Sequence, residues 1–118
     1  MITSIQGMHA WLLQRLTAVF MLVCFVVAAL YFLLSPPQSY EEWRTVVTAT
    51  PVALALALFF IAVSLHAWIG LRDIIIDYVH RFSLRILVLS LIFIVLFGQT
   101  LWLFLVLIKA MHPMTTLL

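Results

Sequence analysis

Residues 52–71 read VALALALFFIAVSLHAWIGL, an unbroken apolar run whose single ionisable side chain is His66. A helix needs roughly 20 apolar residues to cross the hydrocarbon core of a bilayer, so this stretch is long enough to span a membrane. It follows Pro51, a residue that suits the first position of a helix because the amide it lacks would have no partner there. The stretch therefore predicts a transmembrane helix that contains one histidine.

Two more apolar runs flank this one. Residues 16–34 carry no Asp, Glu, Lys, Arg or His and are soon followed by Pro36-Pro37, where proline removes backbone donors and stops a helix. Residues 86–108 form the third run. The sequence therefore predicts an all-α integral membrane protein with three transmembrane helices, at about 16–34, 52–71 and 86–108.

The whole composition fits a membrane protein. Of 118 residues, 67% are hydrophobic and 8% are charged, and the mean hydropathy is +1.28. Such values lie outside the range of soluble domains. A chain of this length holds three spans with short connections, so we expect a single membrane-anchor domain over residues 1–118 and no separate catalytic module. The net charge of +2 comes from basic residues scattered at helix ends, which argues against nucleic-acid binding.

The distribution of basic residues predicts how the chain is oriented. One side of the predicted spans has more of them than the other, and basic residues are enriched in cytoplasmic segments. The N-terminus is therefore expected in the cytoplasm and the C-terminus in the periplasm. The richer side carries Arg15, Arg72, Arg81 and Arg85, whereas the other carries Arg44 and Lys109.

Between the first two runs, Ser39-Tyr40-Glu41-Glu42 matches a capping box. In this motif the serine hydroxyl and the glutamate carboxylate accept hydrogen bonds from the first free amides of a helix. The motif predicts a short surface helix that continues through Arg44.

His66 points most directly to function, because an ionisable side chain inside a span is costly unless it faces a partner, a cavity or a cofactor. It precedes Arg72 by six positions, which places it about 9 Å inside the cytoplasmic boundary of the span. Ala62 and Gly70 lie one turn away on its face, so the ring projects from a stretch with little side-chain bulk. A flat ligand such as haem, whose iron takes histidine axially, would suit that surface. The alternative is a hydrogen bond from His66 to a neighbouring helix, with Ala62 and Gly70 allowing close packing.

One buried histidine supplies only one axial ligand. The other histidines, His9, His80 and His112, lie outside the predicted spans. A bis-histidine haem would therefore need its second ligand from another chain, so the haem interpretation predicts a partner subunit.

Polar residues near the cytoplasmic end of the second span are further candidates. Asp73 and Asp77 follow His66 by seven and eleven positions, so a continuing helix places both acids on its face, and Tyr78 comes next. A phenol and a carboxylate there are able to hydrogen-bond a quinone and pass protons to it. The alternative is an interfacial tyrosine beside solvated acids.

His9 and Arg15 lie before and at the mouth of the first span. Both are able to pair with an anion such as a haem propionate. The alternative for Arg15 is that it serves only as a topology anchor. In the third span, Gly98-Gln99-Thr100 interrupts the apolar run, and we interpret these residues as interhelical packing and hydrogen-bonding positions.

Several of these residues form a pattern that resembles a known family. The segments 66–70 (HAWIG) and 77–79 (DYV) closely resemble the hydrophobic membrane anchor subunit of bacterial succinate dehydrogenase, also called complex II. Three weaker matches occur in the family's order. They are His9 with Arg15, Tyr40-Glu41-Glu42-Trp43, and Leu84-Arg85.

The resemblance implies that His66 is one axial ligand of a haem b, and that the other ligand comes from a second membrane anchor subunit. His9 and Arg15 would lie near the propionates, Tyr78 would hydrogen-bond ubiquinone, and Asp77 would lie close to the proton entry route. Succinate would be oxidised at a flavin in the flavoprotein subunit, and electrons would pass through clusters of the iron–sulfur subunit. The family resemblance also implies a multi-pass protein of the bacterial inner membrane.

Three other interpretations compete with this one. A haem-free fumarate reductase anchor would have the same three spans but no need of His66. A structural or assembly protein would need neither His66 nor Tyr78. A half-transporter would be expected to show broken helices or a charge at mid-membrane, and the three runs show neither.

Overall fold

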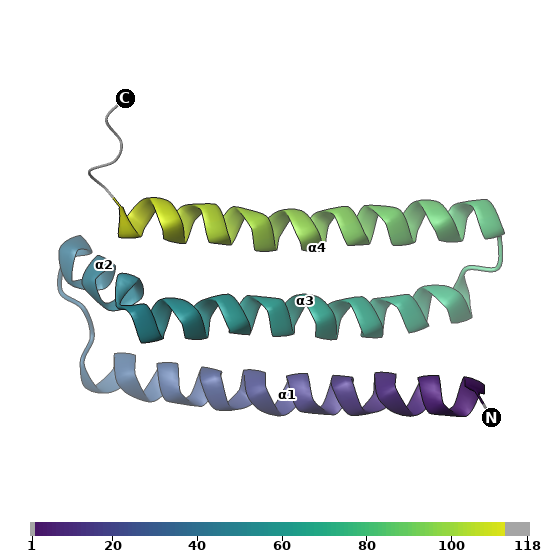
Figure 1. The fold of residues 1–118 in the computed structure, drawn as a ribbon, viewed down its shortest axis with the longest axis horizontal. Coiled ribbons are helices and arrows are strands. Elements are labelled where there is room, and N and C mark those ends of the chain that lie inside the picture. Colours follow the sequence, from purple (N-terminus) through teal and green to yellow (C-terminus); the bar gives the residue numbers. More distant parts are fainter. Residues whose placement is uncertain (1, 113–118) are drawn as a thin grey trace.

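The computed structural model describes residues 2–112, with side chains from residue 7 onward. The regular secondary structure of its described part is all helical and consists of α1 (Ile2–Leu34), α2 (Tyr40–Thr48), α3 (Thr50–Tyr78) and α4 (Phe82–Met111). The three long helices lie side by side in one layer with α3 in the middle (Figure 1). Each is long and apolar enough to cross a membrane. The predicted fold class is therefore confirmed, and the helices extend beyond the apolar runs because the flanking polar residues continue them.

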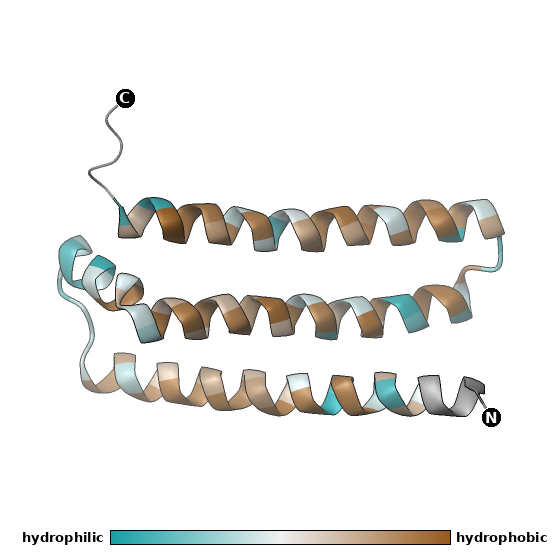
Figure 2. Cartoon of the chain, in the orientation of Figure 1, coloured by the Kyte–Doolittle hydropathy of each residue, from teal (hydrophilic) through white to brown (hydrophobic). Residues whose placement is uncertain are grey.

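The two ends of the layer differ in their connections. One end, called the Tyr78 end, holds the start of α1, the end of α3 and the start of α4 (Figure 1). The opposite end, called the α2 end, holds the end of α1, the short helix α2, the start of α3 and the end of α4. Figure 2 shows that hydrophobic residues dominate the middle of the long helices, whereas α2 is largely hydrophilic. Which end faces the cytoplasm stays a prediction from the basic residues.

Helix α2 begins as the capping box predicts, with one change of partner. The Ser39 hydroxyl accepts a hydrogen bond from the Glu42 amide at 3.2 Å. The Glu42 carboxylate accepts from the Gln38 amide at 2.7 Å, one residue before the expected Ser39 amide. Both bonds satisfy donors near the N-terminus of a helix, where the first amides lack intrahelical partners.

Two arginines cap the C-termini of neighbouring helices. At the Tyr78 end, Arg85 of α4 donates to the backbone carbonyls of Val79, at 3.0 Å, and Ile76, at 3.2 Å. At the α2 end, Arg44 of α2 donates to the carbonyl of Ala110 in α4 at 3.1 Å. The last carbonyls of a helix have no intrahelical partner and carry partial negative charge, so a cation there stabilises the helix end.

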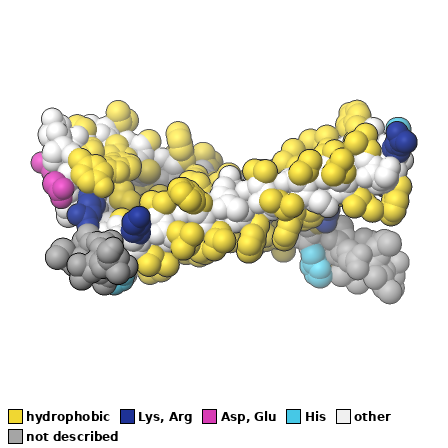
Figure 3. All heavy atoms as spheres, turned by 90° about the horizontal axis from the view of Figure 1, so that it is seen from above, with side chains coloured by type: hydrophobic (Ala, Val, Ile, Leu, Met, Phe, Trp, Pro, Cys, Tyr) yellow, Lys and Arg dark blue, Asp and Glu magenta, His cyan; other side chains and the backbone are white. Residues whose placement is uncertain are grey.

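The interior of this layer is small. Among the residues whose side chains the structure describes, the buried ones are the apolar Ala53, Ala62, Ile69 and Leu107, together with Thr17, each 6–7% exposed. Most large apolar side chains are exposed instead, and they cover the length of the face drawn in Figure 3, while most charged side chains lie toward its two ends. An apolar surface this extensive requires lipid or a partner protein to cover it.

Polar side chains join α3 to α4 within the apolar region. The hydroxyls of Ser64 and Thr100 are hydrogen-bonded at 2.8 Å, and Gln99 donates to the Ser64 hydroxyl at 3.5 Å. The hydrogen-bonding role predicted for Gln99 and Thr100 is therefore confirmed. Gly98 is exposed, and a side chain built there would meet no atom within 4 Å, so it is no packing position within the described chain.

Candidate functional site

The site centres on a contact between α1 and α3. The Nδ1 atom of the His66 ring lies 3.1 Å from the hydroxyl oxygen of Thr17, a hydrogen-bonding distance. Thr17 is only 6% exposed, and His66 is half-buried. The two helices run in opposite directions beside each other (Figure 1), which brings residues far apart in the sequence to the same depth in the layer.

Close helix packing covers the small residues on either side of His66. Ala62 is 6% exposed. A Cβ atom added to Gly70 would lie 3.4 Å from the Nε2 atom of Gln14, so α1 also covers this position. A flat ligand therefore has no room over the Ala62–Gly70 surface. On this side of the ring the close-packing alternative, a hydrogen bond to a neighbouring helix, is the one the structure has.

The other ring nitrogen of His66 stays available. Nε2 forms no hydrogen bond with any residue of the described part, 2–112, and it is not an enclosed atom. Among these same residues no group of three or more His, Cys, Asp and Glu side chains could hold a metal ion. With Nδ1 held by Thr17, the atom of the His66 ring that would bind a metal is Nε2.

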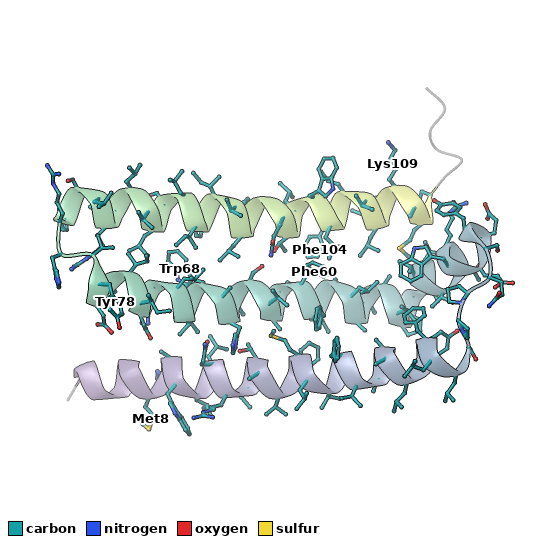
Figure 4. All side chains as sticks on the ribbon, turned by 180° about the vertical axis from the view of Figure 1, so that it is seen from behind. Met8, Phe60, Trp68, Tyr78, Phe104 and Lys109 are labelled. Atoms are coloured by element: carbon teal, nitrogen blue, oxygen red, sulfur yellow. The ribbon has the colours of Figure 1, made fainter. Side chains whose placement is uncertain are left out.

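Two residues along the chain from His66, aromatic side chains of α3 and α4 form a partly exposed row. Trp68 points toward α4 (Figure 4), where its ring meets that of Phe93 edge to face, with centroids 5.7 Å apart. Phe97 stacks on Phe93 at 6.0 Å. An open groove of about 430 Å³ lies along this aromatic row. Its lining is mostly apolar and consists of Trp68, Ile86, Leu89, Ser90, Phe93 and Ile94.

Tyr78 and Asp77 lie at the last turn of α3, next to the α3–α4 connection (Figure 4). Tyr78 is 78% exposed, and Asp77 is exposed too. Neither side chain forms a hydrogen bond or ion pair with another described residue, whereas Arg85 holds the backbone carbonyls on either side of them. Their polar atoms are therefore free to bind a ligand or solvent at this end.

Arg15 and His9 are exposed on α1 and form no hydrogen bond or ring contact with His66. The guanidinium of Arg15 lies over the Trp11 ring, 5.6 Å from its centroid, a cation–π contact that keeps the charge at the surface of the helix. Arg72 forms an exposed ion pair with Asp73 at 3.0 Å. Pairs of this kind contribute little stability, so this contact gives Asp73 no evident role in the site.

Sequence reasoning missed the two polar residues of α1 that face α3. Thr17 binds the ring of His66, and Gln14, one turn earlier, reaches Gly70 and keeps a buried amide oxygen without a partner among the described residues. A signal did exist. Thr17 is a hydroxyl residue inside an apolar run, and with Gln14 it has the spacing of one helix face.

Comparisons with known proteins point to one family. A model of the family described as succinate dehydrogenase/fumarate reductase transmembrane subunit matches residues 1–111. A curated relative, the succinate dehydrogenase hydrophobic membrane anchor subunit of Coxiella burnetii (strain RSA 493 / Nine Mile phase I), is 28% identical over 100 residues. The match covers 85% of this chain and 87% of the relative.

Proposed function

Since the chain belongs to the succinate dehydrogenase/fumarate reductase transmembrane subunit family, we propose that it anchors a succinate:quinone oxidoreductase, with His66 as an axial ligand of a haem b and Tyr78 in the ubiquinone site. The anchoring role follows from three helices able to span a membrane and from the family itself.

The His66 ring is the observation that carries the haem proposal. Its Nδ1 is occupied by Thr17 and its Nε2 has no partner among the described residues, which is how a metal-binding histidine is commonly held. A bound haem supplies a centre that takes up and releases one electron. His66 provides one ligand to the iron, and the hydrogen bond to Thr17 holds its ring against α1. A second membrane anchor subunit provides the other ligand.

Tyr78 and Asp77 are the proposed contribution to quinone reduction. An exposed phenol donates a hydrogen bond to a quinone oxygen, and an exposed carboxylate beside it takes up protons from water and passes them on. The end of α3, where Arg85 binds two backbone carbonyls, supports this role by holding the turn of backbone that carries both side chains. Because α3 alone encloses no quinone, the site is completed by the second membrane anchor subunit and the iron–sulfur subunit.

Arg15 and His9 are proposed to bind the propionate groups of the haem. Both are exposed on α1 toward the same end of the layer as Tyr78, and both are donors suited to carboxylate oxygens. Arg15 would have to leave or share its contact with Trp11 to do so, and a surface arginine has the reach for that movement.

The extensive exposed apolar surface supports the proposed partners. The second membrane anchor subunit would cover part of it, and lipid of the bacterial inner membrane the remainder. The flavoprotein subunit, with its flavin, and the iron–sulfur subunit, with its clusters, would lie in the cytoplasm at the Tyr78 end. This places the N-terminus inside, as the basic residues predict.

A His66→Leu variant of the assembled complex tests the haem ligand. We expect the reduced-minus-oxidised optical spectrum of a low-spin b-type haem to be lost or strongly altered, because leucine cannot bind iron. Thr100→Val is a matched control, since it removes a polar contact on the other side of α3 and leaves the ring alone. An unchanged low-spin spectrum in His66→Leu would refute the assignment.

The packing around His66 favours a haem-free anchor of the same family as the alternative. The hydrogen bond to Thr17 and the covered Ala62–Gly70 surface give His66 a structural role without any metal. In that case the purified parent complex would contain flavin but no haem.

A further inference from the structure

The hydroxyl group of Thr17 has three polar neighbours but only one proton to donate. Its oxygen lies 2.8 Å from the Leu13 carbonyl, 3.1 Å from the Gln14 carbonyl and 3.1 Å from Nδ1 of His66. A carbonyl oxygen only accepts, so the hydroxyl proton serves the carbonyls of α1, of which Leu13 is the nearer. The contact with His66 then needs its proton from the ring, and Nδ1–H donates to the threonine oxygen.

This direction of donation decides the state of the other ring nitrogen. A neutral imidazole carries one proton, so a proton on Nδ1 leaves the lone pair on Nε2. Nε2 is the ring atom that has no hydrogen-bond partner among the described residues. Thr17 is 6% exposed, so water does not compete for its oxygen.

We infer that Thr17 is a positioning residue that holds His66 in the tautomer and orientation required for metal binding at Nε2. The inference rests on the proposed haem ligation. The hydroxyl is itself anchored to its own helix and threonine is stiff about its first side-chain torsion, so the acceptor offered to Nδ1 does not move. Ala62, small and buried, lets α1 come close enough for the contact.

The hydrogen bond to Thr17 would also influence the redox potential of a metal bound at Nε2. An imidazole that donates through Nδ1–H gives more electron density to iron at Nε2, and this favours the oxidised state. If the threonine oxygen is removed, the reduced state of the haem becomes more favourable relative to the oxidised state. We expect the ratio of reduced to oxidised haem at a fixed potential to rise by roughly two- to tenfold, the range of one hydrogen bond.

The test uses the assembled complex with Thr17→Val, which keeps the shape and removes the hydroxyl, and Thr17→Ser, which restores a hydroxyl. Redox titration and the low-spin electron paramagnetic resonance signal are the readouts. We expect Thr17→Val to shift the haem midpoint potential upward and to alter the signal, and Thr17→Ser to behave like the parent. Thr100→Val, which loses an interhelical hydrogen bond away from the ring, should also match the parent.

Each result has a defined meaning. A Thr17→Val complex with the parent's potential and signal overturns the inference, as does an equal shift in Thr100→Val. If Thr17→Val does not assemble, Thr17→Ala replaces it. Loss of haem in Thr17→Val and Thr17→Ala, with haem kept in Thr17→Ser, supports the inference. Loss of haem in all three Thr17 variants counts against it. A parent complex without haem, or a His66→Leu complex with the parent spectrum, defeats the proposed function itself, and that result is distinct from these.

Discussion

Replacing Arg85 by methionine tests how the end of α3 that carries Tyr78 is held. The variant keeps an unbranched apolar stem and loses both hydrogen bonds, to the carbonyls of Val79 and Ile76. A hydrogen bond to a charged group contributes about 1.5–3 kcal/mol when well shielded from water. Because Arg85 is half-buried and the bond to Ile76 is exposed, we expect the pair together to contribute about 1–3 kcal/mol.

A loss of that size favours the frayed end of α3 by a factor of about 5 to 150. The frayed turn contains Asp77 and Tyr78. We therefore expect ubiquinone reduction by Arg85→Met to fall, with a raised quinone KM, while succinate oxidation with an artificial soluble acceptor persists. Steady-state assays of the purified complex with each acceptor measure both activities.

Arg44→Met is the matched control, because Arg44 caps α4 at the opposite end of the layer. It should lower the heat stability of the complex without changing the quinone KM. Identical quinone kinetics in Arg85→Met and the parent would refute the claim that this cap positions Tyr78.

Two further predictions concern the α3 side chains. Tyr78→Phe removes a phenol that has no partner among the described residues, so we expect stability to be kept and quinone reduction to drop, and equal rates with quinone in variant and parent would remove Tyr78 from the site. Ala62→Leu inserts bulk where α3 meets α1, which typically costs about 1–3 kcal/mol, so haem content and yield should fall. Gly70→Ala is the mild counterpart, because its new Cβ would lie 3.4 Å from the flexible Gln14 side chain. Absorbance and yield of purified complex measure both changes, and equal losses from the two substitutions would contradict the packing described.

The spans were predictable because hydrophobicity and proline act locally. A long apolar run and Pro51 predict a membrane helix without knowledge of its neighbours, and the structure has α3 there. The start of α2 followed in the same way from Ser39 and Glu42, although Glu42 selects the Gln38 amide. That change of partner depends on the path of the chain before the helix, which the motif does not encode.

The pairing of residues across helices was less predictable. Periodicity places His66, Ala62 and Gly70 on one face, but it does not reveal which helix covers that face or at what height. The contact of Thr17 with His66 was therefore not predictable, because it depends on how α1 lies against α3. The helix caps made by Arg85 and Arg44 were not predictable for the same reason, since each joins groups on different helices.

The site at the Tyr78 end was identified by its residues and not by its shape. The sequence singles out Asp77 and Tyr78, and the structure leaves both exposed at the end of α3. A quinone site needs walls that one layer of three helices does not supply. In the proposed complex those walls would belong to other subunits, which this sequence does not describe.

The most direct test of the account is the reduced-minus-oxidised optical spectrum of the detergent-solubilised complex that copurifies with this chain. We predict the spectrum of a bis-histidine b-type haem, reduced when succinate is added, together with a flavoprotein and an iron–sulfur subunit in the same preparation. A complex with these subunits and no haem would contradict the role proposed for His66 and leave a haem-free anchor. Purification of the chain without any flavoprotein would contradict the proposed enzyme complex as a whole.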